Sequence, residues 1–116
     1  GMFRAMQLAA ATALEAEADW YEGNNENYRN RRHLAGEIMK TLGCTYDEKQ
    51  VGMFLWGKIP ASCKDVEELT EKVLHEARVF ITPGFIFGSN GARYIRISLC
   101  CKDNKLAEAL ERIKRI

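Results

Sequence analysis

The segment over residues 83–98 restricts the possible folds of this chain more than any other. Its sequence is Pro-Gly-Phe-Ile-Phe-Gly-Ser-Asn-Gly-Ala-Arg-Tyr-Ile-Arg-Ile-Ser. Three glycines followed by a run of strand-forming residues predict a tight loop that leads into a β-strand. Because side chains alternate along a strand, Ile95 and Ile97 are expected to face a core, while Tyr94 and Arg96 lie on the opposite face.

Arg96 is the candidate functional residue of this strand. Its guanidinium is planar and permanently charged, and it lies between the hydroxyl-bearing Tyr94 and Ser98. Such a group can hold a carboxylate through two parallel hydrogen bonds. A single arginine on a strand is more often solvated or ion-paired, so the surrounding pattern has to decide between these interpretations.

Three other segments add to this pattern. They are Gly52-Met53-Phe54-Leu55-Trp56, the motif Tyr28-x-x-Arg31-Arg32 followed by Leu42-Gly43, and the opening residues 1–10. Taken in their order along the chain, these segments and residues 83–98 resemble the C-terminal part of the class I/II, fold type I, pyridoxal-phosphate-dependent aminotransferases. The resemblance covers almost the whole chain and is to the aspartate, alanine and diaminopimelate aminotransferase types.

The resemblance implies the fold of that family's small domain. This is an α/β (α+β) fold in which helices pack on a small, mainly antiparallel sheet. Residues 1–116 would form a single domain. Within it, residues 1–43 would supply two helices that link to a cofactor domain outside this sequence, and residues 44–116 would form the sheet-and-helix unit.

Local patterns predict the element order α-α-β-α-β-β-α. The expected elements are helices over 2–15 and 17–42, a strand over 50–59, a helix capped by Ser62 and Asp65, a short strand over 79–81, the strand of Arg96, and a last helix capped by Asp103. The strand over 50–59 is apolar on both faces, with Val51, Met53 and Leu55 on one and Phe54 and Trp56 on the other. This pattern predicts a central strand, or one covered by another domain.

The resemblance also implies an activity and its site. The full-length enzyme would use pyridoxal phosphate to transfer an amino group between an amino acid and a 2-oxo acid, as a homodimer. Arg96 would bind the substrate carboxylate, and Phe54 would lie at the mouth of the active site. The family binds its cofactor through a lysine in a Ser-Lys or Ser-x-x-Lys context, and none of the eight lysines has that context. We therefore expect no catalytic residue and no bound cofactor in this chain.

The overall charge argues against a nucleic-acid partner. Seventeen basic and sixteen acidic residues give a net charge of +1, without the basic surplus of nucleic-acid-binding proteins. The one basic cluster comprises Arg29, Arg31, Arg32 and His33, and we expect it to form a solvated helix face. No apolar run is long enough to span a membrane, so no membrane partner is expected.

The four cysteines indicate the cellular compartment. Cys44, Cys63, Cys100 and Cys101 lack the spacing of metal ligands, so no metal site is expected. Nothing in the pattern suggests a disulfide framework, and we predict reduced thiols in a cytoplasmic protein. Glu15 interrupts the apolar N-terminal stretch, which argues against a secretory signal.

A non-enzymatic alternative also fits the element pattern. Residues 50–116 follow the order β-α-β-β-α, which is close to a split ferredoxin-like sheet. Such a module could bind a small molecule or a partner protein, and fold alone does not distinguish it from an enzyme domain.

Overall fold

The computed structural model describes all 116 residues and contains four α-helices and four strands. They are α1 (Arg4–Leu14), α2 (Ala18–Thr41), β1 (Thr45–Tyr46), β2 (Phe54–Lys58), α3 (Val66–Lys72), β3 (Thr82–Pro83), β4 (Tyr94–Ser98) and α4 (Asp103–Lys114). A π-helical turn, η1 (Val73–Ala77), extends α3, and the 3-10 turns η2 (Gly84–Phe87) and η3 (Ser89–Gly91) join β3 to β4. The predicted order lacked β1, since a two-residue strand is too short to show an alternating pattern.

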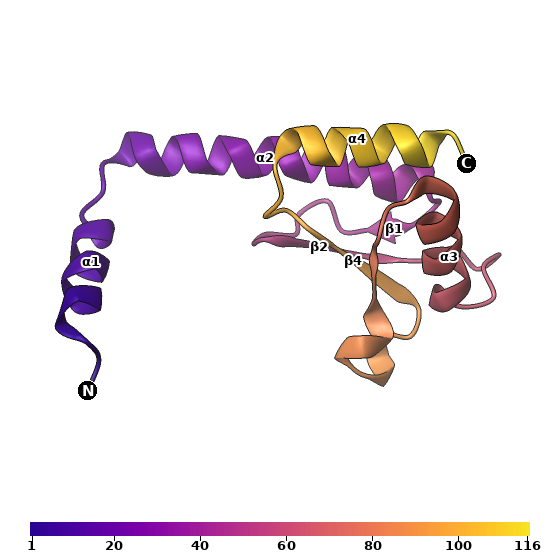
Figure 1. Cartoon of the computed structure of the whole chain (residues 1–116), viewed down its shortest axis with the longest axis horizontal. Coiled ribbons are helices and arrows are strands. Elements are labelled where there is room, and N and C mark those ends of the chain that lie inside the picture. The colour runs from indigo at the N-terminus through magenta and orange to yellow at the C-terminus, as the bar shows by residue number, and fades with distance from the viewer.

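The strands form one antiparallel sheet in the order β1-β2-β4-β3. Helices α2 and α4 run side by side along one face of the sheet (Figure 1). The hydrophobic core lies between these helices and the sheet. Its fully buried side chains include Met39, Leu55, Ile95, Leu99 and Ile113. The prediction of a small antiparallel sheet with helices packed on it is confirmed. The other face of the sheet carries no α-helix, only the short turn η2 beside β4, and this open face holds the candidate site.

The N-terminal arm extends away from this body. Figure 1 shows α1 and the first half of α2 projecting beyond the sheet. Helix α1 has no buried residue, and all the buried residues of α2 lie between Ala35 and Met39. The radius of gyration is therefore 17.1 Å, against about 13 Å for a compact domain of this length. The arm exposes large apolar side chains: Met2, Phe3, Met6, Leu8, Leu14 and Trp20. No helix is long and apolar enough to cross a membrane.

The strand predicted over residues 50–59 is shorter than expected, because β2 begins only at Phe54. Gly52 has a φ of +91° and Val51 is 88% exposed, so Val51 and Met53 do not belong to the strand and do not share the buried face of Leu55. The Gln50 side chain instead folds back along β2. Its amide donates to the Trp56 carbonyl at 2.7 Å and accepts from the Trp56 N–H at 2.9 Å. This side chain pairs with the β2 backbone as a neighbouring strand would.

Two predicted helix caps and one strand were also misplaced. Asp65 alone caps α3, accepting from the Glu68 N–H at 2.8 Å, and the Glu68 carboxylate accepts from the Lys64 N–H in return. The capping box therefore begins at Asp65 and not at Ser62. Asp103 is already inside α4 and accepts a hydrogen bond from a distant arginine rather than capping the helix. The short strand predicted over 79–81 is displaced to β3.

Burial of Cys44 makes the stability of the chain sensitive to alkaline pH. Burial raises the pKa of this thiol from 9.0 to about 11. The folded state therefore holds the thiol proton more tightly than the unfolded chain does. The resulting stabilisation is complete below pH 9 and is lost as the pH rises to about 11.

We expect Cys44→Ala to be destabilised near neutral pH and to approach the parent chain in stability at high pH. Urea unfolding of both proteins at several pH values between 7 and 11 measures this difference. Cys101→Ala, which removes an exposed thiol, is the control and should leave the pH dependence unchanged. If the plots of unfolding free energy against pH stay parallel for Cys44→Ala and the parent chain over this range, the assignment of the pH dependence to Cys44 is wrong.

Candidate functional site

The candidate site lies in the middle of the open face of the sheet. In the antiparallel pairing of β2 and β4, Trp56 lies opposite Arg96 and Phe54 lies opposite Ser98. Thr82 of β3 flanks Arg96 on its other side. Along β4, Ile95 and Ile97 are buried and Arg96 is half-buried, so the alternation predicted from the sequence is confirmed.

The guanidinium of Arg96 is held between two aromatic rings. Its Cζ atom lies 4.2 Å from the ring centroid of Phe54 and 4.1 Å from that of Phe87. Both distances are within the range of cation–π attraction. None of the ion pairs in the chain includes Arg96, so its charge has no acidic partner here. Both rings therefore pack on the guanidinium, and its N–H groups make no hydrogen bond within the chain.

The aromatic layer continues beside Arg96. Trp56 stacks on Tyr94 with 5.3 Å between the ring centroids and 13° between the planes. Trp56 also meets Phe87 edge to face at 6.1 Å. The Gln50 amide fixes the backbone of Trp56 from the far edge of β2. Arg96 is therefore part of a packed aromatic surface and is not a free side chain on a strand.

The position of Phe87 depends on a close contact between two glycines. A Cβ atom on Gly91 would lie 2.0 Å from the Gly84 carbonyl oxygen, and one on Gly84 would lie 2.4 Å from the Gly91 carbonyl oxygen. Both positions therefore require glycine on steric grounds. The turns η2 and η3 fold against each other at this point, and Phe87, the last residue of η2, packs over Arg96. Sequence reasoning identified the glycines of the loop but not the role of Phe87.

Arg93, three residues before Arg96, has a different role. Its guanidinium donates to the backbone carbonyls of Pro60, Cys63 and Lys64 at 2.8–2.9 Å. These bonds hold the loop between β2 and α3 against the start of β4. Arg93 is therefore fully engaged within the chain, whereas Arg96 is not.

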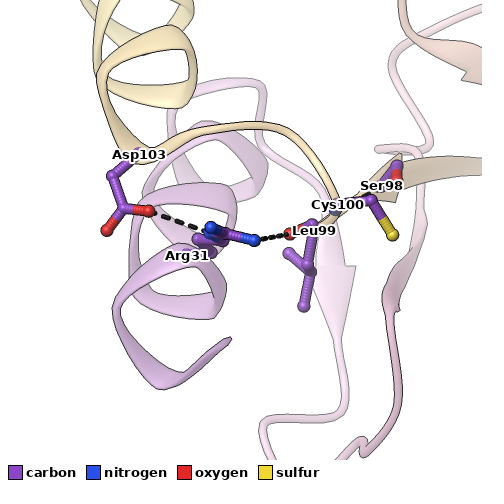
Figure 2. A network of polar contacts seen from close by, with 5 residues as sticks. All are labelled: Arg31, Ser98, Leu99, Cys100 and Asp103. Atoms are coloured by element: carbon purple, nitrogen blue, oxygen red, sulfur yellow. Dashed lines mark hydrogen bonds and ion pairs between the residues drawn. The ribbon is translucent and has the colours of Figure 1, made fainter. Parts of the chain in front are cut away.

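Arg31 connects α2 to the end of the same strand (Figure 2). Its Nε donates to Asp103 at 2.8 Å, and its Nη1 donates to the Leu99 carbonyl at 3.2 Å. The hydrogen bond to Asp103 is the main cause that raises the pKa of Arg31. Arg32 donates to the Gly52 carbonyl at 2.6 Å. The prediction that this basic cluster is a solvated face was therefore wrong for Arg31 and Arg32, because both bind loops that bound the sheet.

The His, Cys, Asp and Glu side chains of the chain do not form a metal site. No three His, Cys, Asp or Glu side chains gather closely enough to hold a metal ion. All four cysteines are free thiols, with Cys44 buried and Cys100 and Cys101 exposed.

Comparisons with known proteins place this chain in a family. The family model for aminotransferase class I and II matches residues 2–113. An LL-diaminopimelate aminotransferase of Desulforudis audaxviator is 36% identical over 114 residues, which are 98% of this chain and 29% of that enzyme. Transaminase BacF of Bacillus subtilis is 32% identical over 117 residues, with 29% of its length covered.

Solved structures agree with this placement. The apo-BacF structure superimposes on 99% of the chain with a TM-score of 0.78 and 33% identity, and 30% of that chain is covered. An aromatic aminotransferase from Pyrococcus horikoshii OT3 superimposes on 94% of this chain with a TM-score of 0.79 and 33% identity, again with 30% of that chain covered. This chain thus spans about three tenths of the length of its relatives. It belongs to the class I and II aminotransferases and corresponds to their small domain.

Proposed function

We propose that this chain provides the substrate-carboxylate site of a pyridoxal-phosphate-dependent aminotransferase. The enzyme would transfer an amino group between an amino acid and a 2-oxo acid. The observation that best supports this function is the state of Arg96, which is held between two rings on an open sheet face without an acidic partner. A structural arginine satisfies its charge or its donors within the fold, as Arg93 does.

The geometry of Arg96 suits a carboxylate in particular. With Phe54 and Phe87 packed on the guanidinium, a ligand would bind through its N–H groups, two of which point the same way in this planar fork. A carboxylate accepts both of these hydrogen bonds at once. The amino acid and the 2-oxo acid both carry a carboxylate next to the reacting carbon, so one arginine can orient both substrates. Phe54 would then line the mouth of the site, as its exposed position on β2 allows.

We propose that the residues of this chain do not form a site for the cofactor by themselves. All eight lysines are exposed, whereas a lysine that forms a Schiff base is activated by a desolvated or cationic pocket. We propose that pyridoxal phosphate, which acts as an electron sink for the amino acid when bound, is held by the part of the enzyme that this chain does not span. This chain would then bind and orient the substrate.

The N-terminal arm would join the two parts of the enzyme. We propose that residues 1–43 link the sheet-and-helix unit to the cofactor domain and that the full-length enzyme is a homodimer. The exposed apolar side chains of α1 and Trp20 support a covered position for this arm in the intact protein. The free thiols are typical of a reducing compartment, which supports a cytoplasmic location.

Two assays test whether the cofactor is bound by the part of the enzyme outside residues 1–116. The full-length enzyme should form 2-oxo acid from an amino acid in the presence of pyridoxal phosphate, and residues 1–116 alone should not. After borohydride reduction and digestion, the full-length enzyme should contain one pyridoxyl-lysine outside residues 1–116. A single stoichiometric pyridoxyl-lysine within residues 1–116 would contradict the proposal. A full-length protein that transaminates no amino acid and 2-oxo acid pair would support the non-enzymatic binding module instead.

A further inference from the structure

Phe87 lies outside the sheet yet contacts the centre of the candidate site. It ends the turn η2 and is 50% exposed, as its neighbours Phe85 and Ile86 are to a similar degree. Unlike them, it stacks on a charged group, with the Arg96 Cζ atom 4.1 Å from its ring centroid. Its ring also meets Trp56 edge to face. Phe87 is thus a turn residue whose ring packs on two side chains of the open face.

We infer that Phe87 is a positioning residue that, together with Phe54, fixes the plane of the Arg96 guanidinium and turns its N–H edge toward the substrate carboxylate. This inference rests on the proposed function of Arg96. An arginine side chain has several rotatable bonds, and a free one loses this freedom when it binds a ligand. A guanidinium already held between two rings loses less, so it binds the same carboxylate more tightly.

The contact between Phe87 and Arg96 depends on the turn formed by η2 and η3. Phe54 belongs to β2 and stays beside Arg96 as long as the sheet is intact. Phe87 is followed by Gly88, whose φ is +123°, and reaches Arg96 only because Gly84 and Gly91 are in contact. One ring is therefore supplied by the sheet and the other by the turn. We expect the loss of the Phe87 ring to leave the sheet intact and to free one face of the guanidinium.

The full-length enzyme provides the test, with two classes of substrate. One is an amino acid, and the other is a primary amine of the same side chain without the carboxylate. Phe87→Leu should lower kcat/KM for the amino acid about tenfold, mainly through KM, since one cation–π contact is lost. It should leave the amine rate unchanged within about twofold. Phe87→Tyr keeps the ring and should restore amino-acid kinetics. Phe85→Leu, on the same turn without a stacking contact to Arg96, is the matched control.

A double-mutant cycle separates the inference from the function on which it rests. In an Arg96→Lys background, Phe87→Leu should have almost no further effect on amino-acid kinetics, because its action passes through Arg96. Equal losses for amino acid and amine, or additive effects of the two substitutions, would overturn the positioning role. If Arg96→Lys alone changes nothing, the proposed function fails first. If Arg96→Lys is impaired and folded Phe87→Leu is not, the inference about Phe87 alone fails.

A second replacement covers the case in which Phe87→Leu does not fold. Cyclohexylalanine at position 87 keeps the volume of the ring and removes its π-electrons. The inference predicts a selective loss for the amino acid in this variant, of the same order as for Phe87→Leu. Amino-acid kinetics equal to those of the parent enzyme would overturn it.

Discussion

Arg96→Lys is expected to reduce kcat/KM of the full-length enzyme for amino acids and 2-oxo acids alike. We expect a loss of about 2–5 kcal/mol in transition-state stabilisation, because lysine keeps the charge but cannot supply two parallel donors to the carboxylate. Steady-state kinetics with both substrates of one pair measure this loss. The effect on a carboxylate-free amine should be small, since that substrate has no group for Arg96 to bind.

Arg93→Lys is the matched control for this experiment, because it makes the same change three residues away. Arg93 holds three loop carbonyls, so this variant should lose stability by about 1–3 kcal/mol and retain its kinetics. Arg96→Lys should show the opposite behaviour, with altered kinetics and little change in melting temperature. Unchanged kinetics in a folded Arg96→Lys enzyme would remove Arg96 from the site.

Gly91→Ala is expected to destabilise the chain by about 3 kcal/mol or more. The new Cβ would lie 2.0 Å from the backbone oxygen of Gly84, and neither backbone segment can rotate away as a side chain could. The turns η2 and η3 would have to separate. Urea unfolding of residues 1–116, monitored by circular dichroism, measures the loss in the free energy of unfolding.

Gly23→Ala is the matched control for the glycine contact. Gly23 lies inside α2, and no atom lies within 4 Å of the position that a Cβ would occupy there. Alanine favours the helix at this position, so this variant should gain about 0.5–1 kcal/mol. A Gly91→Ala protein as stable as the parent would mean that the turn is not held by the glycine contact.

The sequence was sufficient to predict the features that depend on local periodicity. The alternation of Tyr94 to Ser98 placed Arg96 on the face opposite Ile95 and Ile97, because period-two patterns in a strand depend only on neighbouring residues. The two N-terminal helices and Gly43 at the end of the second followed from propensity and from a stop signal. The structure has these elements close to the predicted limits.

Features that depend on distant contacts could not be predicted in this way. The Gln50 side chain pairs with the Trp56 backbone, although the alternating pattern had suggested that residue 50 begins the strand itself. Local sequence predicts Asp103 as a helix cap, because nothing near it in the chain indicates that it pairs with Arg31, 72 residues away. The place of Phe87 depends on the contact between two glycines, and no periodic pattern extends through a turn of this kind.

The most direct test of the account is a crystal structure of the full-length enzyme with a bound substrate carboxylate. We predict that the guanidinium edge of Arg96 donates two parallel hydrogen bonds of about 2.8 Å to this carboxylate. The rings of Phe54 and Phe87 should remain packed on the guanidinium, as they are here. A carboxylate bound by other groups, or Arg96 paired with an acidic side chain of the enzyme, would contradict the account.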